Sequence, residues 1–152
     1  MESQTEKTIL PVIGWREFLS LPELGIDKIK AKIDTGARSS ALHAFDIEHF
    51  ERDGVPSVRF KVHPEQRNGN VTAIAEAPLL DERHVRNSGG QTQMRPVIQT
   101  TIGLGERRWA IELTLTNRDA MGFRMLLGRQ GIRRQFWVDA GRSFLWSSGK
   151  EV

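Results

Sequence analysis

The chain has 152 residues, of which 38% are hydrophobic, and it carries 22 Lys and Arg against 19 Asp and Glu. This length suits one domain with a sizeable core, and the absence of cysteine from the sequence excludes disulfides, thiolate metal sites and a cysteine nucleophile. No apolar run approaches the roughly 18 residues that cross a bilayer, and the polar, acidic N-terminus does not resemble a signal peptide. We therefore expect one domain over residues 9–147, disordered tails at 1–8 and 148–152, no membrane partner, and a cytoplasmic location.

The net charge of +3 is unevenly distributed, because residues 106–152 hold nine basic and five acidic residues. The surplus is nearly all arginine, a side chain suited to binding carboxylates or phosphates. A solvated basic face explains the same pattern. The basic residues are dispersed and accompany no recognised nucleic-acid-binding motif, so we expect no nucleic acid partner.

Strand patterns dominate the chain. Apolar and polar residues alternate over 29–33 and 58–62, and Asn68-Gly69 supplies hairpin-turn chemistry soon after the second segment. Two further strands are predicted over 95–102 and 109–115. These signals predict a mainly β domain, formed as a small barrel or as folded sheets closed by hairpins.

The remaining elements are shorter. Apolar residues at 136–138 and 144–146 flank a turn, which predicts a terminal hairpin. Helical periodicity is confined to one or two turns near 15–19 and a short helix near 129–134.

The first alternating strand ends in Asp34-Thr35-Gly36. Such a triplet is common in polar turns that follow strands, but Gly36 also lets the backbone approach a ligand or partner closely. Ninety residues later the chain has Met125-Leu126-Leu127-Gly128-Arg129, a short apolar strand that ends in Gly-Arg. An Asp-Thr-Gly-Ala motif, followed by an apolar-apolar-Gly-Arg strand and a short helix, resembles the paired signature of retropepsins.

This resemblance implies a retropepsin-like (acid protease) closed barrel, one lobe per chain. It assigns catalytic roles to Asp34, Thr35 and Gly36. Structural support of their loop would come from the strand residues Leu126, Leu127 and Gly128. Ala37 would line the substrate groove.

Only one Asp-Thr-Gly triplet is present, whereas an aspartic peptidase needs two carboxylates. We therefore expect a homodimer in which Asp34 from each chain meets about a two-fold axis. Two carboxylates that close together share a proton, so one acts as base and the other as acid. By resemblance, Thr35 would bond the two loops together across the axis.

Retropepsins also place a mobile hairpin, the flap, before two antiparallel strands that precede the Gly-Arg motif. Residues 92–104 and 107–116 fit those strands, which puts the flap tip at 87–91, with Ser88, Gly89 and Gly90 as substrate-contacting residues. An ordinary surface hairpin explains the same glycines. Residues 67–70 form a rival flap tip.

A wider resemblance covers roughly residues 12–147. The segments that carry it are 14–17, 21–22, 29–44, 95–98, 113–121 and 126–129. They resemble a bacterial family with the historical label ATP-dependent zinc protease. Some of its members are associated with RimK-type ATP-grasp ligases, which add glutamate to protein C-termini. The resemblance thus implies a functional link to such a ligase.

The zinc and ATP of that label lack sequence support. The chain has no His-Glu-x-x-His pair and no phosphate-binding Gly-x-x-x-x-Gly-Lys-Ser/Thr loop, and its four histidines lack close ligand spacing. We expect no metal and no cofactor. His43 is expected to pack or hydrogen-bond near the loop.

One position departs from the viral retropepsins. There an acidic residue usually follows Asp-Thr-Gly-Ala and pairs with the arginine of Gly-Arg, but here that position is Arg38. Arg38 and Arg129 could be neutralised by an outside anion, by another acid such as Asp119 or Asp139, or by internal groups. We count both arginines as substrate-binding and hypothesise a preference for acidic peptides, such as glutamate-rich protein tails.

Two functions follow as expectations. The intact triplet favours an aspartic endopeptidase. The loss of the acid at position 38 favours the alternative, a non-catalytic peptide-binding or regulatory module that modulates a glutamate ligase.

Overall fold

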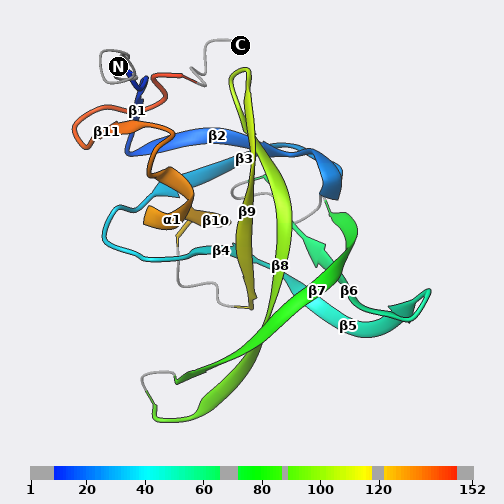
Figure 1. Cartoon of the computed structure of the whole chain (residues 1–152). Coiled ribbons are helices and arrows are strands. Elements are labelled where there is room, and N and C mark those ends of the chain that lie inside the picture. Colours follow the sequence, from blue (N-terminus) through cyan, green and yellow to red (C-terminus); the bar gives the residue numbers. More distant parts are fainter. Residues whose placement is uncertain (1–8, 66–71, 87–88, 118–121, 147–152) are drawn as a thin grey trace, which may run out of the picture.

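A computed structural model describes residues 9–65, 72–86, 89–117 and 122–146 of the chain. It contains eleven strands among these residues (Figure 1). They are β1 (Val12–Gly14), β2 (Arg16–Leu21), β3 (Ile26–Ile33), β4 (Ser40–His43), β5 (Phe45–Arg52), β6 (Val55–Val62), β7 (Ala73–Arg86), β8 (Thr92–Leu104), β9 (Arg107–Thr116), β10 (Met125–Leu127) and β11 (Trp137–Asp139). A 3-10 turn over Pro22–Leu24 and the helix α1 (Arg129–Ile132) complete the described elements. No helix within these ranges is long and apolar enough to cross a membrane.

Six strands close into a barrel. Their order is β2-β3-β10-β4-β9-β8, and a pairing of β2 with β8 joins the two ends. The closing contact is between Ser20 and Gly103, where a Cβ on Gly103 would lie 2.4 Å from the Ser20 hydroxyl oxygen. Glycine at this position therefore lets the two backbones approach. The predicted mainly β, closed retropepsin-like barrel is confirmed, as is a short helix within 129–134.

Alternate residues along each strand fill the barrel interior. Ile29, Ala31 and Ile33 on β3 and Leu113 and Leu115 on β9 are all at most 5% exposed. Because side chains on a strand alternate between faces, the residues between them point out of the barrel. This alternation decides which side chains can reach a ligand on the outer face.

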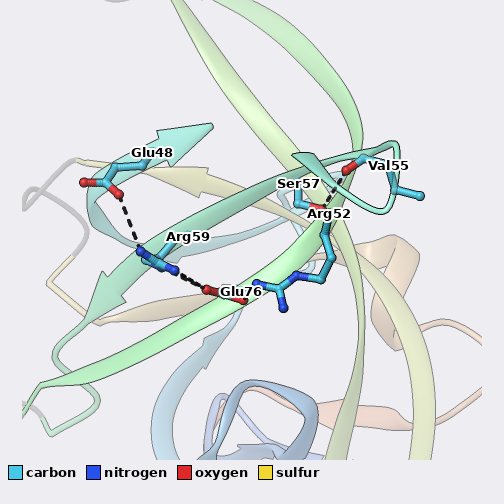
Figure 2. Close-up of polar contacts among 6 residues, drawn as sticks. All are labelled: Glu48, Arg52, Val55, Ser57, Arg59 and Glu76. Carbon is cyan, nitrogen blue, oxygen red and sulfur yellow. Dashed lines mark hydrogen bonds and ion pairs between the residues drawn. The ribbon is translucent and has the colours of Figure 1, made fainter. Parts of the chain in front are cut away.

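Strands β7, β6 and β5 extend the sheet beyond the barrel. Figure 2 shows charged side chains across these strands: Arg59 pairs with Glu76 at 2.7 Å and with Glu48 at 3.9 Å, and Arg52 pairs with Glu76 at 2.6 Å. All four side chains are substantially exposed, so each pair contributes at most about 1 kcal/mol. The network holds the register of the extension and leaves both arginines paired.

The longest hairpin joins β7 and β8 and projects well beyond the rest of the sheet (Figure 1). Gly89 and Gly90 lie at its tip, and Gly90 has a left-handed φ of 84° that suits glycine. This is the hairpin predicted as the flap. Ser88 lies outside the described residues, as do residues 67–70 of the rival flap.

The strands predicted over 29–33, 58–62, 95–102 and 109–115 are confirmed within β3, β6, β8 and β9. The helical turn predicted near 15–19 is wrong, since this segment enters strand β2. Trp15, Phe18 and Leu19 have helical spacing, but the buried side chains are Glu17, Leu19 and Leu21, which alternate.

The predicted terminal hairpin is also wrong. Strand β11 pairs in parallel with β1, through Val12 opposite Trp137 and Ile13 opposite Val138. The segment after β11 bonds to the N-terminal strands instead, with the Phe144 N–H donating to the Arg16 carbonyl at 3.0 Å. The tails expected to be disordered, 1–8 and 148–152, lie outside the described residues.

Candidate active site

The loop at Asp34 begins where the buried strand β3 ends. The Asp34 carboxylate accepts the Gly36 N–H at 2.9 Å, and the Asp34 carbonyl accepts the Ala37 N–H at 3.2 Å, so the triplet forms a tight turn. Asp34 is half-buried, whereas Thr35 and Gly36 are exposed. The carboxylate thus stands at the edge of the sheet with one side open.

Strand β10 fixes this loop from behind. It runs between β3 and β4, pairing Leu127 with Ile33 in parallel and Leu126 with Ala41 antiparallel. The Leu127 carbonyl then accepts the Asp34 N–H at 2.9 Å. The two sequence motifs, about ninety residues apart, therefore meet at this loop.

Gly128 follows β10, and its backbone packs closely against the backbone of Ala37 and Ser39. A Cβ on this residue would lie 2.4 Å from the Ser39 carbonyl oxygen and 2.9 Å from that of Ala37, so no larger residue fits without a backbone shift. The Gly128 N–H donates to the Ser40 hydroxyl at 3.0 Å, and the Arg129 N–H donates to the Ala37 carbonyl at 2.8 Å. Ser40 is 3% exposed. Its supporting role was not predicted, because a serine inside a strand gives no distinctive signal.

The Arg129 guanidinium faces the same loop. Its Nη1 donates to the carbonyls of Thr35 and Gly36 at 3.2 and 3.1 Å. Of the three explanations offered by the sequence, Arg129 follows the internal one. Asp139 instead accepts the Gly141 N–H at 2.9 Å and lies 3.9 Å from Arg142, and Asp119 lies outside the described residues.

Arg38 is exposed and differs from Arg129. Its carbonyl accepts the Gln130 N–H at 3.1 Å, which anchors the backbone, while its side chain is exposed to solvent. Within the described ranges, no carboxylate pairs with the Arg38 guanidinium. This side chain is therefore available to an external anion.

The hairpin tip with Gly89 and Gly90 is separated from the ends of β3 and β10 (Figure 1). The tip residues and the Asp34 loop are thus not in contact in this form of the chain. Among the residues that the structure describes, no group of three or more His, Asp or Glu side chains could hold a metal ion.

A buried carboxylate that the sequence did not reveal lies on β2. Glu17 is fully buried and accepts the N–H groups of Gly14, Leu145 and Trp146 at 2.6, 2.9 and 3.3 Å. The two oxygens of a carboxyl group have enough lone pairs to accept all three N–H groups. Glu17 therefore ties the segment after β11 to the turn between β1 and β2.

Comparison with known proteins bears on this site. A "Probable alpha-L-glutamate ligase" of Parasynechococcus marenigrum is 50% identical over 128 residues, 84% of this chain and 28% of that protein. One of the same name from Shewanella halifaxensis is 42% identical over 141 residues, 93% of this chain and 31% of that protein. The chain therefore spans less than a third of the length of these curated relatives.

A solved structure is similar as well. The crystal structure of a protein of unknown function from Legionella pneumophila superposes with a TM-score of 0.75 at 29% identity, over 89% of this chain and 97% of that one. The family described as "Retropepsin-like aspartic endopeptidase RimB" matches residues 12–148, which include both motifs and every strand. The chain belongs to this RimB-like family.

Proposed function

We propose that the chain is an aspartic endopeptidase that hydrolyses peptide bonds with a dyad formed by Asp34 from two subunits. The observation that carries the proposal is the placement of Asp34: it is half-exposed, while its own N–H is bound by Leu127 and its loop is braced by Arg129. Such fixed presentation of a carboxylate is what a catalytic group requires.

A second copy has a suitable surface beside the loop. A mainly apolar hollow there is lined by Thr35, Ile132, Phe136 and Trp137 among others. Trp137 is 62% exposed, and the neighbouring Val12 is 44% exposed. Contiguous exposed apolar groups of this kind are typical of protein interfaces. A copy seated here would bring its own Thr35 and Asp34 to the axis.

In the dimer, the two Asp34 carboxyl groups share one proton. The ionised group accepts a proton from a bound water as the water oxygen attacks the scissile carbonyl carbon. The protonated group donates its proton to the carbonyl oxygen. The tetrahedral intermediate then collapses: the C–N bond breaks, the leaving nitrogen takes the proton that the first Asp34 received from water, and the second Asp34 recovers its proton from the intermediate as the product carboxyl group forms. The β7–β8 hairpin would close over the peptide and exclude water.

Acidic peptides are the proposed substrates. Arg38 is exposed beside the loop and has no acidic partner within the described ranges, so a peptide carboxylate could take the vacant bidentate position. The relatives' name, glutamate ligase, points to the same chemistry. We propose a functional link in which this chain acts on glutamate-rich tails of the kind a ligase would make.

One observation favours the second candidate, a peptide-binding or regulatory module without cleavage. Arg38 is exposed and has no acidic partner among the residues that the structure describes, so it suits capture of an acidic tail whether or not hydrolysis follows. The two candidates differ in what Asp34 does.

Replacement of Asp34 by Asn separates them. The amide preserves the size of the side chain but can neither serve as base nor share the proton, so hydrolysis of an acidic peptide should disappear while melting temperature and dimer mass stay unchanged. Asp27→Asn, an exposed position on the same strand, is the matched control and should keep full activity. Wild-type turnover in folded Asp34→Asn would eliminate the aspartic mechanism.

Mixing experiments test the shared dyad. If each active site needs Asp34 from both subunits, wild type unfolded and refolded together with an equal amount of Asp34→Asn, so that subunits reassort at random, should retain about a quarter of the activity of an all-wild-type sample treated in the same way at the same total concentration. Retention of half of that activity, the value for independent subunits, would contradict the shared dyad.

A further inference from the structure

Four polar residues on neighbouring strands form a row, which we call the polar row: Arg95 on β8, Thr116 on β9, His43 on β4, and Arg124 just before β10. His43 is paired with Thr116, and its N–H donates to the Arg124 carbonyl at 2.8 Å. Arg95 and Thr116 each lie two residues beyond the paired Val97 and Thr114. The row therefore crosses four strands at one level.

The row lies on the outer face of the barrel. The neighbours Leu42, Leu115 and Met125 are at most 1% exposed and fill the interior. Since successive side chains on a strand point to opposite faces, those of His43, Thr116 and Arg124 are on the outer face of the barrel.

Two residues of the polar row, Thr116 and Arg124, have a buried polar atom without a hydrogen-bond partner among the described residues. Thr116 is 4% exposed, and its hydroxyl has no hydrogen-bond partner among the described residues. The buried Nε of Arg124 lacks one as well. Such groups are uncommon, because an unpaired buried donor costs free energy.

Arginines elsewhere in the sheet have acidic partners. Arg83 on β7 lies opposite Arg95 on β8 and forms an ion pair with Glu112 at 2.9 Å. Arg52 and Arg59 both form ion pairs with Glu76 (Figure 2). The polar row itself contains no acid, and the Arg124 side chain forms no ion pair within the part of the chain that the structure describes. Within the described residues, the Thr116 hydroxyl and the Arg124 Nε are thus two buried donors without an acceptor on neighbouring strands.

The polar row is close enough to the Asp34 loop for one extended peptide to contact both. Leu127, whose carbonyl accepts the Asp34 N–H, is three residues beyond Arg124 on the same segment. At about 3.3 Å per residue along a strand, the separation is about 10 Å, the span of about three residues of an extended peptide. Arg95 and Arg124 are only half-buried, so the ends of the row reach solvent.

We propose that the polar row is a carboxylate-binding subsite, which takes an acidic side chain of the peptide about three residues from the bond at Asp34. One carboxylate oxygen would accept from the Arg124 guanidinium and the other from the Thr116 hydroxyl. The position along the peptide rests on the proposed function, whereas the binding of a carboxylate does not.

The test measures binding in the Asp34→Asn background, where no cleavage can occur. A labelled oligoglutamate peptide and an oligoglutamine peptide of the same length are titrated against each variant. Arg124→Gln should raise the oligoglutamate Kd about tenfold or more, and Thr116→Val, which preserves shape, about threefold or more. The oligoglutamine Kd should not change. Arg108→Gln, an exposed β9 position, removes the same charge as a control.

Equal oligoglutamate affinity in Arg124→Gln and Arg108→Gln would overturn the subsite and leave the proposed function intact, since hydrolysis depends on Asp34. If Arg124→Gln does not fold, Thr116→Val decides, and an unchanged Kd in that variant overturns the proposal. Hydrolysis by Asp34→Asn itself would instead overturn the proposed function.

Discussion

Replacing Gly128 with alanine should damage the candidate site more than any other single methyl group. The added Cβ would lie 2.4 Å from the Ser39 carbonyl oxygen, 2.7 Å from the Ser39 carbonyl carbon and 2.9 Å from the Ala37 oxygen. These neighbours are backbone atoms, so they cannot rotate aside. The loop or strand β10 must move by about 1 Å to restore ordinary contact, which begins at 3.4 Å.

That displacement has a calculable cost. Overpacking of a closed site costs about 1–3 kcal/mol. The shift also weakens the Gly128–Ser40 and Arg129–Ala37 hydrogen bonds, at about 1 kcal/mol each. We expect a loss of about 3–5 kcal/mol in the free energy of unfolding. A displaced carboxylate loop should also lower kcat/KM about 100-fold.

Urea denaturation at fixed subunit concentration measures the first effect, as a lower midpoint at unchanged slope. Peptide hydrolysis measures the second. Gly131→Ala is the matched control, since its Cβ would come close only to side-chain atoms: the end of Leu127 at 2.7 Å, which can rotate, and Ile111 and Ser40 at an ordinary 3.5 Å. Gly131→Ala should stay within about 1 kcal/mol of wild type. Equal effects of the two substitutions would refute the reasoning.

Three further predictions concern other parts of the molecule. Glu17→Gln should destabilise the fold by about 2–4 kcal/mol in urea, because both Glu17 oxygens accept backbone N–H groups and the amide NH2 that replaces one oxygen cannot. Glu112→Gln on the surface should cost less than about 1 kcal/mol, and similar losses would contradict the role of Glu17. Chelation with EDTA should leave activity and melting temperature unchanged, and an activity lost to EDTA and restored by zinc would show that a metal site exists. Trp137→Glu should weaken the dimer in analytical ultracentrifugation and make specific activity fall on dilution, and an unchanged dimer would exclude the Trp137 surface from the interface.

Much of the barrel could be predicted from local sequence. Strands β3 and β9 largely alternate between core and surface, so their side chains reveal the element and the inward face together. Strand β10 is too short for periodicity, and it was found because Gly128 and Arg129 follow its apolar pair.

Strand β2 shows where this logic failed. Its inward positions are Glu17, Leu19 and Leu21, so a charged residue occupies a place where alternation expects an apolar one. The acid is tolerated there because it accepts three backbone N–H groups. Two of those donors lie about 128 residues away, and no local pattern could indicate them.

The same limit applies to the pairing of β1 with β11. Residues 136–138 and 144–146 are close in sequence and separated by a turn, which favours a hairpin. The native partner of Trp137 is Val12, 125 residues earlier. This parallel pairing draws both ends of the domain to one side of the Asp34 loop, beside Thr35.

The two arginines of the motifs illustrate how backbone acceptors change a charge argument. From sequence, Arg38 and Arg129 form an equivalent pair of cations that lack an acid. In the fold, Arg129 follows the glycine that presses against the loop, so its guanidinium reaches the carbonyls of Thr35 and Gly36. Carbonyl groups occur at every residue and are invisible to a count of charged side chains. Because Arg129 braces the loop, the proposed recognition of an acidic peptide would rest on Arg38 and on the polar row, which Arg124 joins because β10 pairs with β4.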